Sequence, residues 1–185
     1  DSEAPICHYF DGFRTSHEIQ NVEFIDDEEW KKLLPMEKVE KFRARALNPH
    51  THPVTRGGAE NDDVYFQGRE AQNKHYDRVL EYAEKYLKEA SRLTGRNYAP
   101  FTYYGREDAE RVIVAMGSVT ETAIEVIDEL KDEKIGLVKV HLYRPFSAKH
   151  LLSVLPETVE RIAVLDRTKE MGAVGEPLYL DVVGV

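Results

Sequence analysis

The chain has 185 residues, with 25 Lys and Arg against 34 Asp and Glu, and its net charge is −9 at pH 7. This acidic balance argues against nucleic acid or an anionic membrane as a partner, since both require basic patches. The single cysteine, Cys7, excludes an internal disulfide and an iron–sulfur cluster held by this chain alone, and it fits a reducing cytoplasm. The apolar runs are too short to span a membrane.

The ends of the chain indicate a piece of a larger protein. It starts at Asp1 with no signal-peptide pattern, and it stops inside the apolar run LYLDVVGV. We therefore interpret it as an internal fragment of a longer polypeptide.

A polar cluster follows the first predicted strand, Ala4 to Phe10, which the turn signal Asp11-Gly12 closes. Open α/β sheets bind ligands beyond the carboxyl ends of their strands, where this cluster would lie. It contains Arg14, Thr15, Ser16 and His17. Two readings stay open: helix capping with an ion pair from Arg14, or direct contact with a ligand.

Helices and an irregular connector are predicted next. Asp26 to Leu34 and Met36 to Leu47 are helical candidates separated by Pro35, and residues 48–63 lack periodicity. Arg69 to Thr94 is predicted as the longest helix, because its apolar residues repeat at i, i+3, i+4 and i+7.

His50 and His52 in the connector form an H-x-H pair that zinc accepts as ligands, but no third ligand accompanies them at a recognised spacing. Hydrogen bonds to the loop backbone are the alternative reading.

The centre of the chain predicts a right-handed βαβ unit. Arg111 to Met116 is a short apolar run that ends at Gly117, and Leu137 to Leu142 is a second strand. Ser118 and Glu121 match a capping box at the start of the intervening helix. The core face of that helix is predicted to comprise Val119, Ala123, Val126, Ile127 and Leu130.

The remaining elements complete an α/β pattern. Phe101 to Gly105 is extended, Ser147 caps a helix that runs to Leu155, Val159 to Asp166 is a strand, and Pro177 begins a helix. The predicted fold is a three-layer α/β/α domain with a mostly parallel, Rossmann-like sheet, preceded by a helical connector.

Motifs for phosphate binding and catalysis are incomplete. The turn at Gly117 opens a helix whose free N–H groups suit an anion, but a dinucleotide fingerprint needs three glycines. The sequence has no P-loop, no G-x-S-x-G elbow and no H-E-x-x-H. A self-contained active site is not indicated.

Two resemblances connect these segments. VIVAMGS, VKVHLYRPFS and IAVLDRTKEMGAVGEP resemble the C-terminal domain of transketolase-like thiamine enzymes, although His141 stands where that family often has an acidic residue. The whole chain resembles the pyruvate:ferredoxin (or flavodoxin) oxidoreductases, or pyruvate synthases. This second resemblance is carried by the segments YFDGFRTSHEIQ, LNPHTHPVTRGGAEN, DVYFQGREAQNKHYD, LTGRNY, VIVAMGSVTET, VKVHLYRPFSAKHLL and AVLDRTKEMGAVGEPLYLDV.

The second resemblance implies a parent enzyme that uses thiamine diphosphate, Mg²⁺ and [4Fe–4S] clusters. Such an enzyme converts pyruvate and coenzyme A to acetyl-CoA and CO₂, and passes electrons to ferredoxin or flavodoxin. Residues 1–60 would end a pyrimidine-binding domain, and residues 61–185 would form most of a transketolase-C-terminal-like domain.

The resemblance assigns no catalytic residue to this piece, which is expected to be inactive alone, to bind no cofactor and to belong to a cytoplasmic homo-oligomer. Arg14, Thr15, Ser16 and His17 would support the cofactor pocket. Structural or interface roles fall to Gly117, Ser118, Arg144, Pro145, Asp166 and Arg167. The alternative is a free-standing Rossmann-like module that binds a nucleotide or a protein.

Overall fold

The computed structural model describes residues 1–54 and 58–185, except for the side chain of Arg14. The chain divides into two compact units, which are described separately. The first contains residues 1–5 and 22–82, and the second contains residues 6–21 and 83–185. No helix within the described ranges combines the length and the apolar composition needed to cross a bilayer.

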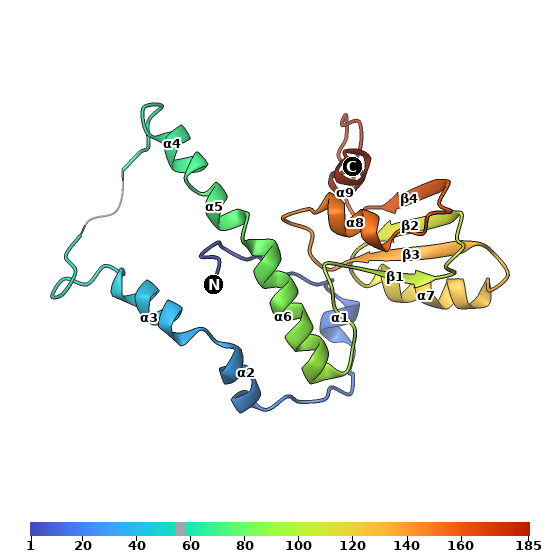
Figure 1. Ribbon diagram of the computed structural model, residues 1–185, viewed down its shortest axis with the longest axis horizontal. Coiled ribbons are helices and arrows are strands. Elements are labelled where there is room, and N and C mark those ends of the chain that lie inside the picture. The colour runs from blue at the N-terminus through green and yellow to red at the C-terminus, as the bar shows by residue number, and fades with distance from the viewer. Residues whose placement is uncertain (55–57) are drawn as a thin grey trace. The chain divides into compact units, whose positions relative to one another are not determined.

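The first unit consists of short helices and connecting segments (Figure 1). Helices α2 (Asp27–Leu33) and α3 (Met36–Ala44) flank Pro35, as predicted, and the carboxylate of Asp26 accepts the N–H of Glu28 to cap α2. None of the apolar side chains described in this unit is buried. It therefore gains little hydrophobic stabilisation from its own contacts.

The prediction of one long helix over Arg69 to Thr94 is wrong in its extent. The structure has α4 (Tyr65–Glu70), α5 (Asn73–Tyr76) and α6 (Val79–Thr94), with turns between them. Asn73, the first residue of α5, and Asp77, which follows its last residue, have low helix propensity. The apolar repeat continues from Tyr76 to Val79 and Leu80 across the second turn, so periodicity does not reveal that turn.

The second unit is built on a four-stranded sheet with the order β1-β3-β2-β4. Its strands are β1 (Phe101–Gly105), β2 (Arg111–Ala115), β3 (Ile135–Val140) and β4 (Arg161–Leu165). β2 pairs in parallel with both β3 and β4, and β1 pairs antiparallel with β3. The predicted α/β class with a mostly parallel sheet is confirmed.

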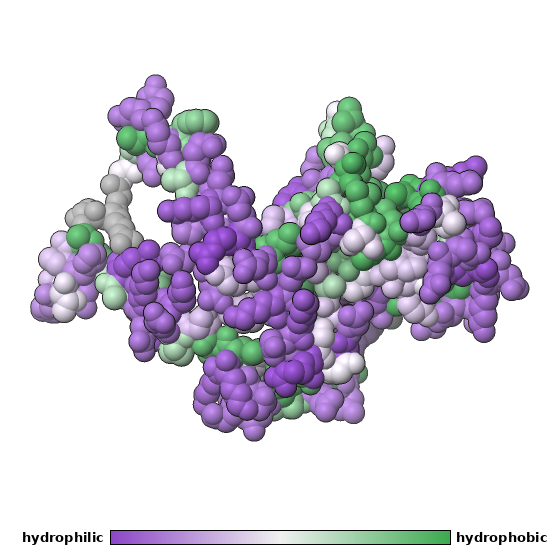
Figure 2. Space-filling view, in the orientation of Figure 1, coloured by the Kyte–Doolittle hydropathy of each residue, from purple (hydrophilic) through white to green (hydrophobic). Residues whose placement is uncertain are grey.

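Helices cover both faces of this sheet, which gives the predicted three layers (Figure 1). On one face α7 (Val119–Glu129) packs its Ile127 with Ala115 and Leu137. On the other, α8 (Ala148–Val154) and α9 (Pro177–Val183) contribute Leu151 and Leu178 to the larger core cluster. Apolar surface also remains exposed around α8, α9 and β4 (Figure 2).

Two sequence predictions about this unit need correction. The strand predicted for Ala4 to Phe10 is absent: these residues pair with no strand in the described chain, and Ile6 is 83% exposed. The face predicted for α7 is partly wrong, because Val119, Val126 and Leu130 are exposed. The face of α7 that packs against the sheet is rotated about the helix axis from the predicted face. It contains Thr120, Ala123, Ile124 and Ile127.

Helix α8 is tied to α6 through a histidine. Ser147 makes no capping bond to the helix backbone, although the sequence predicts one. Its hydroxyl lies 2.7 Å from Nδ1 of His150, and Nε2 of His150 lies 2.8 Å from a carboxylate oxygen of Glu84. The Ser147 hydroxyl therefore bonds to the imidazole and does not cap the helix.

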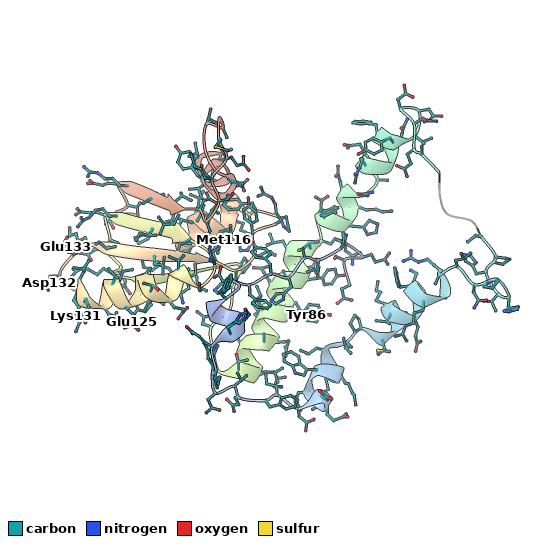
Figure 3. All side chains as sticks on the ribbon, turned by 180° about the vertical axis from the view of Figure 1, so that it is seen from behind. Tyr86, Met116, Glu125, Lys131, Asp132 and Glu133 are labelled. Atoms are coloured by element: carbon teal, nitrogen blue, oxygen red, sulfur yellow. The ribbon has the colours of Figure 1, made fainter. Side chains whose placement is uncertain are left out.

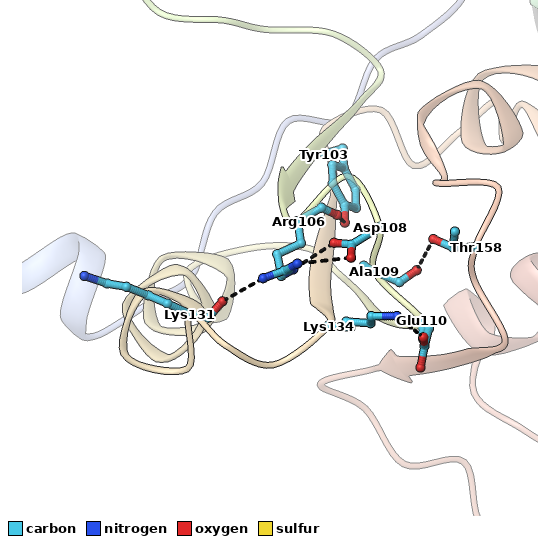
Figure 4. Close-up of polar contacts among 8 residues, drawn as sticks. All are labelled: Tyr103, Arg106, Asp108, Ala109, Glu110, Lys131, Lys134 and Thr158. Carbon is cyan, nitrogen blue, oxygen red and sulfur yellow. Dashed lines mark hydrogen bonds and ion pairs between the residues drawn. The ribbon is translucent and has the colours of Figure 1, made fainter.

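A polar network joins the loops at the amino ends of β2 and β3 (Figure 4). Arg106 donates two hydrogen bonds to the carboxylate of Asp108, at 2.8 and 3.0 Å, and a third to the carbonyl oxygen of Lys131. Lys134 pairs with Glu110 across the same loops. These contacts close the edge of the sheet opposite to the candidate site.

Candidate functional site

A cavity of about 920 Å³ lies within the second unit, at the carboxyl edge of its parallel strands. Met116 marks this edge, and the turn with Lys131, Asp132 and Glu133 marks the opposite one (Figure 3). The lining comes from residues 7–13 and from the segments after β2, β3 and β4. It comprises Cys7, His8, Tyr9, Phe10, Asp11, Gly12, Phe13, Met116, Gly117, Ser118, Val119, Thr122, Val140, His141, Leu165, Asp166 and Arg167.

Asp11 makes the central polar contacts of this cavity. One carboxylate oxygen accepts the backbone N–H of Ser118, and the other accepts a guanidinium N–H of Arg167. The side chain of Asp11 is only 16% exposed. Hydrogen bonds from Ser118, followed by Arg167, hold the pKa of the Asp11 carboxyl below its usual value. The carboxylate is therefore held in its ionised form.

Gly117 allows the carboxylate to come this close. Its φ of +82° lies in the left-handed region that favours glycine, and a Cβ there would meet Oδ2 of Asp11 at 2.8 Å. A side chain at Gly117 would therefore strain the backbone and also displace the carboxylate of Asp11.

The predicted capping box at Ser118 and Glu121 does not form. Ser118 has helical backbone angles and no side-chain capping bond, while Glu121 pairs with Lys139 at 2.8 Å. The hydroxyl of Thr120 donates instead to the carbonyl oxygen of Gly117, at 2.8 Å. The carboxylate of Asp11 accepts the Ser118 N–H, the bond that Glu121 would accept in a capping box, and it lies at the amino end of α7, where a negative charge is favourable.

Four of the predicted structural residues meet at this cavity. Gly117 and Ser118 follow β2, and Asp166 and Arg167 follow β4. Asp166 also accepts the backbone N–H groups of Leu178 and Tyr179, at 3.3 and 3.0 Å. Parallel pairing of β2 and β4 brings these two turns together.

Arg144 and Pro145 lie outside the lining of the cavity. Arg144 donates to Asp181 of α9 at 2.5 Å, and its guanidinium lies 4.2 Å from the centre of the Tyr143 ring. These two contacts connect the turn after β3 to α9.

Residues 14–17 form the short helix α1 (Arg14–His17) beside the cavity segment. His17 stacks on Phe13 with a ring separation of 5.6 Å, and its Nδ1 lies 2.7 Å from the hydroxyl of Ser16. Thr15, Ser16 and His17 are exposed and do not line the cavity, whereas Phe13 does. The prediction for Arg14 rests on a side chain outside the described part of the chain.

The His50 and His52 pair lies in a turn organised by Asn48. Asn48 and His52 exchange two backbone hydrogen bonds, and the Asn48 side chain accepts the N–H of His50 at 2.9 Å. Within residues 1–54 and 58–185, no three His, Cys, Asp or Glu side chains group together as potential metal ligands.

Asp11 and His141 make the most specific polar contacts among the cavity residues that the sequence does not indicate as site candidates. The sequence marks Asp11 only as part of a turn signal, and its partner Ser118 lies 107 residues away. His141 lines the cavity, with Nε2 3.1 Å from the hydroxyl of Thr102 and its ring edge-on to Tyr98. Desolvation and then the charge of Lys139 lower the pKa of His141. In the sequence, His141 is notable only because it stands where the transketolase-like family often has an acidic residue.

The fold and cavity define an α/β domain that carries a preceding segment against the carboxyl edge of its sheet. Residues 1–88 match the family model described as pyruvate flavodoxin/ferredoxin oxidoreductase, thiamine diP-bdg. Residues 109–184 match the model described as pyruvate:ferredoxin oxidoreductase core domain II. The chain belongs to the pyruvate:ferredoxin/flavodoxin oxidoreductase family.

Similar proteins include bacterial and protozoan enzymes. The chain is 54% identical over 184 residues to a probable pyruvate-flavodoxin oxidoreductase of Escherichia coli K12, covering 98% of this chain and 16% of that protein. It is 52% identical over 183 residues to the pyruvate:ferredoxin oxidoreductase of Moorella thermoacetica, with the same coverage. For the pyruvate dehydrogenase [NADP(+)] of Cryptosporidium parvum, the identity is 48% over 185 residues, which cover 98% of this chain and 10% of the relative.

Proposed function

We propose that this chain is a structural and interface segment of a thiamine-diphosphate-dependent pyruvate oxidoreductase. The parent enzyme would convert pyruvate and coenzyme A to acetyl-CoA and CO₂, and would pass electrons to ferredoxin or flavodoxin. Relatives named as pyruvate-flavodoxin or pyruvate:ferredoxin oxidoreductases match nearly the whole chain, although the chain spans only 16% of their length.

One contact supports this role most directly. Asp11 belongs to the segment that matches the thiamine-binding family model, while Ser118 and Arg167 belong to the segment that matches domain II. The carboxylate of Asp11 bonds to both of them. A joining segment requires such contacts between the two family regions, and a self-contained active site does not.

The cavity residues do not fit the diphosphate of the cofactor. Among the described lining residues, Arg167 is the single Lys or Arg side chain, and it already pairs with Asp11. Asp11 also occupies the N–H of Ser118, and Asp166 adds a second carboxyl group to the lining. A diphosphate requires unpaired donors and cations, so we place its site, with Mg²⁺ and the [4Fe–4S] clusters, in other parts of the parent.

We retain the division into residues 1–60 and 61–185 as part of this proposal, together with a cytoplasmic homo-oligomer. Thr15, Ser16 and His17 would support the cofactor pocket from α1, with Arg14 beside them. These assignments rest on the family resemblance and on the position of α1 next to the cavity segment.

An activity assay of the full-length protein tests the proposal. With thiamine diphosphate, Mg²⁺, pyruvate and coenzyme A, the protein is expected to reduce a viologen dye, and omission of pyruvate or of coenzyme A should abolish the reduction. The 185-residue chain should give only the background rate. Saturable nucleotide binding by the full-length protein, without any pyruvate-dependent reduction, would instead support a Rossmann-like binding module.

A further inference from the structure

We propose that Asp11 is a positioning residue that latches the segment carrying α1 onto domain II, through the amino end of α7 and Arg167. This proposal rests on the proposed function, because it gives the joining segment a specific contact. In this proposal, the carboxylate of Asp11 alone places the α1 turn beside the cavity.

The two carboxylate oxygens have separate partners, which fixes the direction of the side chain. Oδ2 accepts the Ser118 N–H, and Oδ1 accepts the Arg167 guanidinium. An amide at this position can still accept one bond, but it loses the charge that both Arg167 and the helix terminus favour. Alanine removes both bonds.

Neighbouring contacts hold the same segment along the edge of the sheet. The hydroxyl of Tyr9 donates to the sulfur of Met116 at 3.3 Å, and desolvation raises the pKa of Tyr9. Residues 1–10 have no strand pairing in the described structure. Because no backbone hydrogen bonds to a neighbouring strand hold these residues, side-chain contacts must keep the segment ordered.

The latch also determines the start of α1. Phe13, two residues after Asp11, has a φ of +53° and receives the ring of His17 in a stacked contact. Its carbonyl oxygen accepts the backbone N–H of His17 at 2.7 Å. Asp11 is thus the anchored residue nearest to α1, and release of its carboxylate would free the turn that begins the helix.

Hydrogen exchange of the Ser118 amide, measured on the full-length protein, tests the latch without relying on activity. Asp11→Ala should speed this exchange about tenfold or more, because a charge-assisted bond to the amide is lost. Asp108→Ala is the matched control, since it removes a carboxylate paired with Arg106 at the opposite edge of the sheet. The control should leave Ser118 exchange at the wild-type rate.

Chemical rescue separates a latch from general destabilisation. Formate, substituted for chloride at constant ionic strength, can enter the space left by Asp11→Ala and accept the Ser118 N–H. Formate should slow the exchange again in Asp11→Ala and have no effect on wild type or Asp108→Ala. Wild-type exchange in Asp11→Ala, equal acceleration in Asp108→Ala, or failure of formate to slow the exchange would each overturn the latch.

The positioning role has its own readout. In the full-length enzyme, Asp11→Ala should lower kcat/KM for pyruvate, relative to Asp108→Ala, and formate should restore part of it. Unchanged kcat/KM together with altered Ser118 exchange would overturn the positioning role. A wild-type protein with no pyruvate oxidation would refute the proposed function, while the exchange measurements would still decide whether the latch exists.

Discussion

The carboxylate of Asp166 caps helix α9 from a distance, by accepting the backbone N–H of Tyr179 at 3.0 Å. It also accepts the N–H of Leu178, whose side chain is fully buried in the core. Glu176, at the capping position itself, makes no side-chain capping bond. A residue at the end of β4 therefore orients a helix that begins eleven positions later.

Loss of this cap should destabilise the domain. Asp166→Ala is expected to lower the free energy of unfolding by about 1 kcal/mol, the usual cost of removing a helix cap, and Asp166→Asn by less. Urea unfolding measures both changes. Equal urea midpoints for Asp166→Ala and wild type would show that α9 does not depend on this carboxylate.

Two glycines with almost equal φ angles allow backbone strain to be distinguished from steric crowding. Gly117 has a φ of +82° beside Asp11, and Gly172 has a φ of +83° with nothing within 4 Å of its Cβ position. Gly172→Ala should cost about 1 kcal/mol through strain alone. Gly117→Ala should cost about 1 kcal/mol more, because the added Cβ meets the Asp11 carboxylate.

Urea midpoints of both variants give the comparison, and Asp11→Ala supplies the control. In the Asp11→Ala background the extra cost at Gly117 should disappear, since the crowding atom is gone. Equal costs for the two glycines in the wild-type background would refute the close approach of Asp11.

The βαβ centre could be predicted from the sequence, and the contacts made by its turn could not. Apolar runs bounded by Gly117 were enough to locate β2, α7 and β3. The Ser118 capping box failed because Asp11, 107 residues earlier, supplies the acceptor instead. Capping rules consider only residues that are close in sequence, so they cannot predict a carboxylate that the tertiary fold brings to the helix.

The same limitation explains two other differences. Residues 4–10 have strand composition, but a strand also needs a paired neighbour, and the sheet gives it none in the described chain. Ser147 has the composition of a helix cap, but its hydroxyl bonds to His150, which Glu84 holds on the other side. In the first case a missing strand partner decides the local structure, and in the second the nearby His150, which the distant Glu84 holds, decides it.

Stability should depend on pH through His141. Desolvation, together with Lys139, lowers its pKa in the folded state, so below pH of about 6.5 the unfolded chain binds more protons. The free energy of unfolding should therefore decrease as pH falls from about 6.5 toward the folded-state pKa. Urea unfolding at intervals between about pH 7.5 and 5 should show a steeper loss in wild type than in His141→Gln. Parallel curves would contradict the assignment.

Arg144 is expected to serve stability and assembly, and not the binding of pyruvate. Arg144→Ala loses the contacts with Asp181 and Tyr143, and it should lower the free energy of unfolding by about 1 kcal/mol. Arg92→Ala, which breaks an exposed pair with Glu89, should cost about 0.5 kcal/mol or less. Thermal melting and steady-state kinetics of the full-length enzyme check this. Normal melting with a large rise in the KM for pyruvate would reverse the interpretation of Arg144.

The central claim is that this chain joins parts of the enzyme and does not itself hold the cofactor. Calorimetric titration with thiamine diphosphate and Mg²⁺ tests it most directly, with the full-length protein and the 185-residue chain measured in parallel after both show cooperative melting. The full-length protein should bind the cofactor, and the 185-residue chain should release no binding heat. Binding of equal affinity by the two proteins would contradict the claim, because the diphosphate site would then lie within residues 1–185.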